Sequence, residues 1–407
     1  MAEKKKSKIE KRYGFDKAFI GLMRFTAVPF LKLRYGVKTG SHDTLPAGPC
    51  VVLYNHVTDL DVAWVIDKFR EQMYCVASEH IVRFPVAGKL LSIFFAPILI
   101  KKGTSGAGAV MEMSRHLRAG HKVLMAPEGV RSGNGLTNPI VPTTAAVLKK
   151  LKCPVVTVRI HGGYFTTPRW GRGVRKGLIT LEKVGEYSAE EIAGMPSAAF
   201  LERIAGDLSE DAYAYNERLG DAKIAYRGKN PAEGIETQLY LCPQCRRLLT
   251  IRSKGNEFFC DCGLHGTINE YGILNGNNLP YSTIRDWDAW ESKYIADLPK
   301  ELDLLLRDKD SGMYSEEGIL LQSPDITLSE ISKEHKNAVL SEGKLVLTKD
   351  TLSVGDYVIP LSEIEEVSVI GYGILLLFSK DKHYFEFRGK ERYPGIAYLN
   401  FIRKLKK

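Results

Sequence analysis

Residues 50–61 read CVVLYNHVTDLD, a short apolar run followed by a polar turn that carries His56 and Asp61. The apolar run predicts a strand that ends near Tyr54, and the stretch DVAWVI that begins at Asp61 predicts a helix. Positions five apart on a regular helix point roughly 140° away from each other. The two side chains can therefore meet only if His56 lies in the turn and Asp61 opens the helix.

An imidazole five residues before a carboxylate is a pattern that suits general-base chemistry. With an ordinary pKa of about 6.5, an imidazole can take a proton from an alcohol near neutral pH. A carboxylate bound to its other nitrogen fixes the tautomer and stabilises the imidazolium. His-x-x-x-x-Asp also occurs often by chance, so the pair alone does not establish a catalytic site.

Two further apolar runs lead into charged loops. Residues 123–126, VLMA, precede the loop PEGVRSG at 127–133, whose glycines permit a close backbone approach and whose arginine suits an anionic oxygen such as phosphate. A second run, residues 96–100, ends on Lys101 and Lys102. Ligands of α/β sheets collect at the carboxyl ends of strands. We therefore expect an α/β domain in which the three loops share one rim.

At these residues the chain resembles the glycerolipid acyltransferases, marked by Asn-His-x-x-x-x-Asp and a later Phe-Pro-Glu-Gly-Thr-Arg-Ser. The matching positions are Asn55, His56 and Asp61, then Pro127, Glu128, Gly129, Arg131 and Ser132, with Ala126 and Val130 replacing the usual Phe and Thr. Lys102 stands where a motif between them usually ends in arginine, and PVVTV at 154–158 stands where a later one usually reads Pro-Val-x-Pro-Val. The resemblance spans residues 36–225.

The resemblance implies a mixed sheet flanked by helices and assigns roles to the matching residues. His56 would deprotonate the hydroxyl of a lysophospholipid, which then attacks the thioester of acyl-CoA or acyl-carrier protein, while Asp61 orients His56. Backbone amides at the start of the Asp61 helix would stabilise the oxyanion. The residues implied in substrate binding are Asn55, Lys101, Lys102, Glu128, Gly129, Arg131 and Ser132. Within that set, Glu128 is expected to brace Arg131 rather than to touch an anion.

The resemblance leads us to expect 1-acyl-sn-glycerol 3-phosphate as the acceptor and phosphatidic acid as the product. Another lysolipid or a glycolipid acceptor stays open, and so does a non-catalytic lipid-binding scaffold. Four other histidines are expected to be packed or hydrogen-bonded rather than to act as a second base. They are His80, His116, His121 and His161.

The chain has 407 residues, 44% apolar content and a net charge of +9, which indicates more than one folded domain. Residues 1–50 carry 11 Lys or Arg against 4 Asp or Glu. No nucleic-acid-binding motif accompanies this basic end, so we expect anionic lipid and not nucleic acid as its partner. Arg24 and Pro29 interrupt the apolar stretch 15–31, which therefore predicts an interfacial helix of a peripheral protein on the cytoplasmic face of a membrane. The open alternative is a helix that packs on its own domain.

Two cysteine pairs with turn residues predict a zinc ribbon. The first pair, Cys242 and Cys245, is separated by Pro-Gln. The second pair, Cys260 and Cys262, is separated by one Asp and is followed directly by a glycine. This pattern is typical of a structural zinc ion held tetrahedrally by four cysteines, although a disulfide or redox role is also open. The other cysteines, in apolar surroundings, are interpreted as buried thiols in a reducing compartment. They are Cys50, Cys75 and Cys153.

The predicted order of domains ends in a β-rich segment. From residue 343, short alternating runs followed by a helix at 393–405 resemble a pleckstrin-homology-like, barrel-like domain, for which lipid docking, protein docking and packing all stay open. Ser188 to Glu191 forms a predicted capping box. The expected segments are 1–35 membrane-binding helix, 36–225 acyltransferase domain, 226–235 linker, 236–275 zinc ribbon, 276–342 helical or irregular connector, and 343–407 pleckstrin-homology-like domain.

Overall fold

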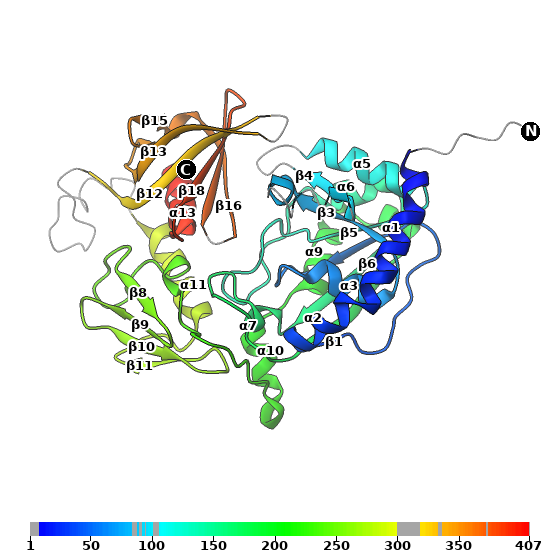
Figure 1. The fold of residues 1–407 in the computed structure, drawn as a ribbon, viewed down its shortest axis with the longest axis horizontal. Coiled ribbons are helices and arrows are strands. Elements are labelled where there is room, and N and C mark those ends of the chain that lie inside the picture. Colours follow the sequence, from blue (N-terminus) through cyan, green and yellow to red (C-terminus); the bar gives the residue numbers. More distant parts are fainter. Residues whose placement is uncertain are drawn as a thin grey trace, which may run out of the picture. The chain divides into compact units, whose positions relative to one another are not determined.

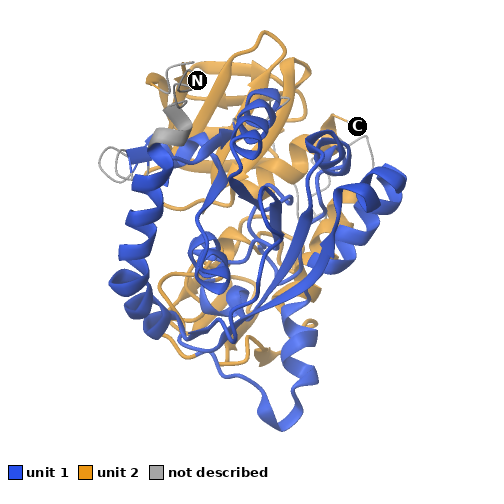
Figure 2. Cartoon of the chain, turned by 90° about the vertical axis from the view of Figure 1, so that its right-hand side faces the viewer, with its two compact units in different colours: residues 1–101, 105–167, 176–226 blue, residues 102–104, 168–175, 227–407 orange. Residues whose placement is uncertain are grey.

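The structure is a computed structural model that describes residues 8–83, 88, 92–93, 95–100, 106–298, 318–332, 336–371 and 373–406. The chain divides into two compact units, coloured separately in Figure 2. Unit 1 comprises residues 1–101, 105–167 and 176–226, and unit 2 comprises 102–104, 168–175 and 227–407. No helix among the described residues has both the length and the apolar character that crossing a membrane requires.

Unit 1 is built on a seven-stranded sheet in the order β1-β7-β6-β2-β5-β3-β4. Figure 1 labels β1, β3, β4, β5 and β6 of this sheet. The strands are β1 (Val37–Lys38), β2 (Val51–Tyr54), β3 (Met73–Ser78), β4 (Ile98–Ile100), β5 (Lys122–Met125), β6 (Val155–His161) and β7 (Ile179–Tyr187). β6 and β7 pair antiparallel, and the other neighbours pair parallel. The predicted α/β fold class with a mixed sheet flanked by helices is confirmed.

Helices cover both faces of this sheet, which explains why β2 is apolar at every position. Val51 and Leu53 belong to one buried cluster, with α5, α6 and α9. Val52 and Tyr54 point to the other face and pack with α3. The helices of unit 1 are α1 (Lys8–Phe25), α2 (Ala27–Tyr35), α3 (Asp61–Phe69), η1 (Glu79–Arg83), α5 (Ala107–Arg118), α6 (Thr144–Leu151), α7 (Gly163–Thr166), α8 (Ala189–Gly194), α9 (Ser197–Leu208), α10 (Ala212–Arg218) and η2 (Gly220–Ala222).

Several local predictions are confirmed. β2 ends at Tyr54 and α3 begins at Asp61, as the switch from an apolar run to a polar turn indicated. The capping box at the start of α8 is present in both directions, with the Ser188 side chain accepting from the Glu191 amide and the Glu191 side chain accepting from the Ser188 amide.

The amino-terminal helices of unit 1 are anchored from one side and exposed on another. Asp16 is fully buried and accepts a hydrogen bond from the Tyr74 hydroxyl at 2.8 Å. Ile20 packs in the cluster that also holds α3. The large apolar side chains of α1 and α2 that stay exposed are Phe15, Leu22, Phe25, Phe30 and Leu33.

Unit 2 holds two separate antiparallel sheets, one of four strands and one of seven (Figure 1). Its elements are η3 (Ile235–Thr237), β8 (Ile251–Lys254), β9 (Glu257–Cys260), β10 (His265–Ile268), β11 (Leu274–Asn277), α11 (Ile284–Asp297), β12 (Leu321–Ile331), β13 (Asn337–Leu347), β14 (Thr351–Val354), β15 (Tyr357–Pro360), η4 (Leu361–Glu363), β16 (Ile364–Ile370), β17 (Ile374–Ser379), β18 (Tyr384–Gly389) and α13 (Gly395–Leu405). Ala232 and Ile235, from the segment expected to be a linker, are buried in the cluster around the cysteines.

The seven-stranded sheet differs from the expected barrel-like form because it is not a closed barrel. Its order is β15-β14-β13-β12-β18-β17-β16, so among the described residues the short β15 and β16 remain its two edges. A second difference concerns residues 276–342, where the structure has β12 and the start of β13 as well as α11. Pro324 and Asp325 break the alternation of β12 at a register shift between Ser323 and Ile326, and Asp325 has a φ of 52°.

Candidate functional site

His56 and Asp61 meet across the turn between β2 and α3. His56 Nδ1 lies 2.9 Å from Asp61 Oδ2. The Asp61 side chain is 1% exposed, whereas that of His56 is 29% exposed. A carboxylate accepts, so Nδ1 carries the hydrogen and Nε2 carries the lone pair. The arrangement leaves Nε2 as the nitrogen that can take a proton from a ligand.

The Asp61 carboxylate is held by the turn itself. The amides of Val57 and Thr58 donate to Oδ2 at 2.8 and 3.0 Å, and the Thr58 hydroxyl donates to Oδ1 at 2.6 Å. Gly163 lets the start of α7 lie directly against this turn, because a Cβ there would come 2.4 Å from Val57 Cγ2. These contacts fix the carboxylate before any ligand binds.

The amides expected to form an oxyanion site are only partly free for that role. Those of Ala63 and Trp64 donate to the Leu60 carbonyl at 2.9 and 3.2 Å. The amides of Val57 and Thr58 serve Asp61. The Ala63 and Trp64 amides of α3, and the Val57 and Thr58 amides before it, therefore already have partners within the turn.

Glu128 lies on the loop after β5 and reaches the backbone of His56. It accepts from the His56 amide at 2.6 Å, and from the amide and side-chain nitrogen of Asn138 at 2.6 and 3.1 Å. Burial raises the pKa of Glu128 to about 7, although these hydrogen bonds oppose the shift. The carboxyl group therefore fastens the second motif to the first.

Arg131 pairs with Asp59 and not with Glu128, so the expectation that Glu128 braces Arg131 was wrong. Arg131 Nη1 lies 2.7 Å from Asp59 Oδ2. The reason is that Glu128 turns toward the His56 and Asn138 amides, while Asp59 projects from the turn that carries His56. The guanidinium is nevertheless placed at the loop that holds the imidazole.

The other residues of the two motifs mainly position these groups. Asn55 is fully buried and exchanges two hydrogen bonds with the backbone of Ile160 on β6, at 2.7 and 3.0 Å. The Ser132 amide donates to the His56 carbonyl at 2.9 Å. Gly129 is exposed and has a φ of 72°, in the left-handed region that favours glycine. Lys101 and Lys102 lie outside the described residues.

The four histidines that we expected to be packed or hydrogen-bonded do have such contacts. His161 Nδ1 lies 2.9 Å from Glu210 Oε2, and its ring stacks on Tyr215 with centroids 4.2 Å apart. His116 and His121 lie with their Nδ1 atoms 3.2 Å apart. Burial lowers the pKa of His116 to about 4, so that ring is neutral near pH 7. His80 is 2.9 Å from the Arg83 guanidinium.

In unit 2 the four predicted cysteines converge. The sulfurs of Cys242 and Cys262 are 3.6 Å apart and those of Cys245 and Cys260 are 3.8 Å apart, and all four lie within 4.8 Å of one another. A tetrahedral site with Zn–S bonds of about 2.3 Å separates its sulfurs by about 3.8 Å. The cluster therefore fits a metal ion such as zinc.

Three residues of the site were missed by sequence reasoning. Thr58 binds Asp61, Asn138 binds Glu128, and Asp59 pairs with Arg131. Thr58 had a local signal, since a hydroxyl three residues before a helix-opening carboxylate is well placed to contact it. Asn138 and Asp59 had no such signal. Glu128, the partner of Asn138, lies ten residues earlier on the same loop, and Arg131, the partner of Asp59, lies on a different loop.

Several known proteins are similar to parts of this chain. The family model described as Acyltransferase matches residues 36–161. Among solved structures, the chain is similar to the crystal structure of the 1-acyl-sn-glycerophosphate (LPA) acyltransferase PlsC from Thermotoga maritima, with 18% identity, a TM-score of 0.37, and coverage of 49% of this chain and 75% of that one. It is also similar to the solution structure of the N-terminal PH domain of human ARAP2, with 14% identity, a TM-score of 0.18, and coverage of 23% and 83%. No curated protein matches the chain. Residues 36–161 are therefore similar to the acyltransferase family.

Proposed function

We propose that this protein is a peripheral membrane O-acyltransferase that transfers a fatty acyl group from acyl-CoA or acyl-carrier protein to a lysophospholipid. The proposed acceptor is 1-acyl-sn-glycerol 3-phosphate, and the product is phosphatidic acid. The observation that carries the proposal is the 2.9 Å contact between a partly exposed His56 and a buried Asp61, which also accepts from the Val57 amide and from the amide and hydroxyl of Thr58. Both residues lie in the segment that matches the Acyltransferase family model.

The proposed reaction uses His56 first as a base and then as an acid. Nε2 takes the proton of the acceptor hydroxyl as its oxygen attacks the thioester carbonyl carbon. The tetrahedral intermediate then expels the thiolate, the C–S bond breaks, and the thiolate takes the proton from the imidazolium. Asp61 stabilises the imidazolium between the two steps. The products are an ester and a free thiol.

Arg131 is the described cation that we propose for the acceptor phosphate. A guanidinium offers a planar fork of donors that matches phosphate oxygens. Its loop is tied to the His56 turn by the Ser132 amide at 2.9 Å and by Glu128 at 2.6 Å. In this proposal Lys101 and Lys102 add positive charge to the same phosphate site.

We propose that α1 and α2 hold the enzyme on the cytoplasmic face of a membrane. Phe15, Leu22 and Phe25 project within about 80° of one another around α1, and they are 52%, 56% and 87% exposed. Phe30 and Leu33 on α2 are 64% and 69% exposed. Exposed apolar side chains on a basic helix pair suit insertion among lipid headgroups. An insoluble acceptor would then reach His56 without leaving the membrane.

We propose a structural role for zinc at the cysteine cluster. Cys242 and Cys260 lie inside the buried cluster of this part of unit 2, so an ion there would stabilise the fold. Backbone amides of Gln244 and Cys245 donate to the Cys242 sulfur, which suits a thiolate ligand. Four protein ligands complete a tetrahedron and leave no position for a substrate.

The activity is tested by product analysis. Purified full-length protein is incubated with a panel of lysophospholipids and glycolipids, each with acyl-CoA and with acyl-carrier protein, and the lipids are identified by mass spectrometry. We expect phosphatidic acid from 1-acyl-sn-glycerol 3-phosphate with at least one donor. Acylation of a different acceptor alone would refute the substrate, and no acylation of any acceptor would refute the enzyme.

A further inference from the structure

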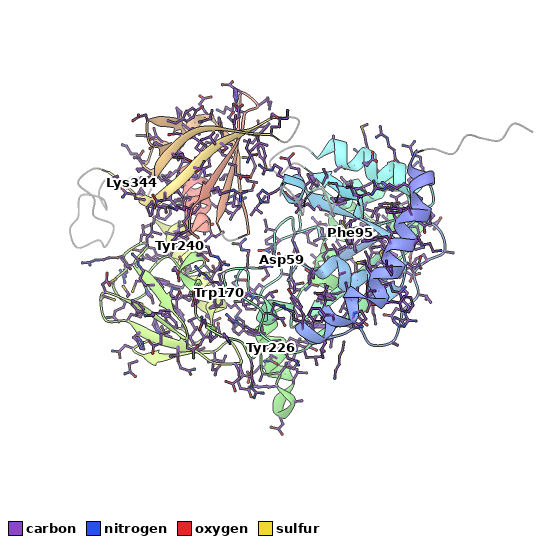
Figure 3. All side chains as sticks on the ribbon, viewed as in Figure 1. Asp59, Phe95, Trp170, Tyr226, Tyr240 and Lys344 are labelled. Carbon is purple, nitrogen blue, oxygen red and sulfur yellow. The ribbon has the colours of Figure 1, made fainter. Side chains whose placement is uncertain are left out.

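Arg131 is already paired with an anion of the chain itself. Its Nη1 lies 2.7 Å from Asp59 Oδ2, and Figure 3 labels Asp59. Asp59 lies three residues after His56, on the turn that Ser132 and Glu128 tie to the Arg131 loop. A phosphate that approaches Arg131 therefore meets a guanidinium that a carboxylate has neutralised.

The two partners of this pair are buried to very different degrees. The Arg131 side chain is 6% exposed, whereas that of Asp59 is 76% exposed. A buried guanidinium needs a counter-ion, because an uncompensated charge inside a protein is strongly unfavourable. An exposed carboxylate loses little when it turns into water, since ion pairs with exposed partners contribute little net free energy. Asp59 is thus the partner that can leave.

Only the side chain of Asp59 has this freedom. The residue before it, Thr58, is fixed by its amide and hydroxyl on Asp61. The Leu60 amide on the other side donates to the Thr58 hydroxyl oxygen at 3.1 Å. A rotation of the Asp59 side chain therefore frees Arg131 without moving the turn that positions His56.

We propose that Asp59 is an internal competitor of the acceptor phosphate and so determines the affinity of the site for phosphate-bearing acceptors. In the acceptor-free enzyme its carboxylate occupies Arg131. A phosphomonoester, which carries more charge and can bind the guanidinium through two oxygens, displaces it. An acceptor without an anionic headgroup leaves the pair intact. The inference rests on the proposed function, because it assigns Arg131 to the acceptor phosphate.

The competition predicts a gain of affinity when the carboxylate is removed. The phosphate no longer has to displace the carboxylate in Asp59→Asn, so its apparent affinity rises by the net free energy of the ion pair. For a pair with an exposed partner this corresponds to an affinity about twofold to sixfold higher than in the wild type. The gain is expected in the dissociation constant and in KM, because Asp59 contacts Arg131 and no interaction of the described site joins it to His56 or Asp61. An acceptor with an uncharged headgroup is expected to keep its KM.

The test measures binding and turnover in the full-length protein. Calorimetry with sn-glycerol 3-phosphate gives the dissociation constant without chemistry, and kinetics with 1-acyl-sn-glycerol 3-phosphate give KM and kcat. The matched control is Glu217→Gln, because Glu217 is also exposed, at 72%, and pairs with Lys223 at 2.8 Å. In a double-mutant cycle, Arg131→Gln is expected to abolish the effect of Asp59→Asn. If Arg131→Gln fails to fold, the comparison of Asp59→Asn with Glu217→Gln decides.

The outcomes separate this inference from the proposed function. Tighter binding of sn-glycerol 3-phosphate by Asp59→Asn and not by Glu217→Gln supports the competition. The same result without acyl transfer by the wild type supports the competition and overturns the proposed function. Unchanged or weaker binding by Asp59→Asn, or no binding by either protein, overturns the competition, even if the wild type makes phosphatidic acid.

Discussion

The contact between His56 and Asp61 predicts a specific defect for Asp61→Asn. An asparagine keeps one oxygen and replaces the other by a donor group. Three donors meet at Oδ2, namely His56 Nδ1 and the amides of Val57 and Thr58, whereas the Thr58 hydroxyl at Oδ1 can rotate and accept instead. We therefore expect the asparagine oxygen to take the Oδ2 position, so that the imidazole keeps its orientation and loses only the negative charge beside it.

The size of the defect follows from that lost charge. Two unit charges 2.9 Å apart interact by at most about 6 kcal/mol at an effective dielectric constant of about 20. Since the proton is only partly transferred in the transition state, about half of this, roughly 3 kcal/mol, is lost from transition-state stabilisation. The kcat value should therefore fall by roughly 10²-fold. KM should change little, because Asp61 is buried.

Steady-state kinetics of phosphatidic acid formation test this prediction, together with thermal unfolding to show that the variant is folded. The matched control is Asp67→Asn, another buried aspartate of α3, which pairs with Lys32 at 2.8 Å instead of with the imidazole. We expect its kcat to stay within about twofold of the wild type. The reasoning is refuted if Asp61→Asn retains more than about a tenth of wild-type kcat, or if both variants lose the same amount.

Three further predictions concern stability, metal and membrane. Burial raises the folded-state pKa of Glu128 from 4.5 to about 7. The stabilisation that the protonated carboxyl group provides is therefore fully present below pH 4.5 and is lost as the pH rises through 7. In urea denaturation, the free energy of unfolding of the wild type should fall by about 2 to 3 kcal/mol between pH 5 and pH 8 relative to that of Glu128→Gln. Elemental analysis should find about one zinc per chain, lost when Cys242 and Cys260 are replaced by serine. Burying one large apolar side chain is worth about 1.5 to 3 kcal/mol, so Phe25→Ser with Leu33→Ser should weaken flotation with anionic liposomes at least about tenfold.

Each of these predictions has a control and an outcome that contradicts it. Parallel stability curves for the wild type and Glu128→Gln would show that the carboxyl group does not titrate in this range. Cys153→Ser, at a buried thiol of unit 1, should leave the zinc content unchanged, and metal-free fresh protein would refute the zinc site. Val358→Ser, at an aliphatic residue that is 55% exposed in unit 2, should leave flotation unchanged. Equal flotation of the double variant and the wild type would contradict the membrane role of α1 and α2.

The sequence predicted the parts of the site that depend on local pattern. An apolar run that stops before a polar turn correctly indicated the end of β2 at Tyr54 and the start of α3 at Asp61. Those two boundaries meet the condition that the helical period sets for His56 and Asp61 to come together, and the structure places their side chains 2.9 Å apart. The spacing of the cysteines likewise indicated a cluster that the structure brings together.

The rest of the site depends on contacts between distant segments and on backbone irregularity. The sequence led us to expect that Glu128 braces Arg131, whereas the approach of its loop to the His56 amide gives it a different partner. The Asp59 and Arg131 pair joins residues about seventy positions apart. β12 escaped detection because Pro324 and Asp325 interrupt its alternation with a bulge, and a register shift of this kind is set by the neighbouring strand.

In the proposed mechanism the His56 imidazole takes the proton of the acceptor hydroxyl. The most direct test is the turnover number of His56→Ala with 1-acyl-sn-glycerol 3-phosphate and the preferred donor, measured beside its melting temperature and its binding to liposomes. We expect a loss of about 10²-fold to 10⁴-fold in kcat, with melting and liposome binding like those of the wild type. Wild-type turnover by a folded His56→Ala protein would contradict this mechanism.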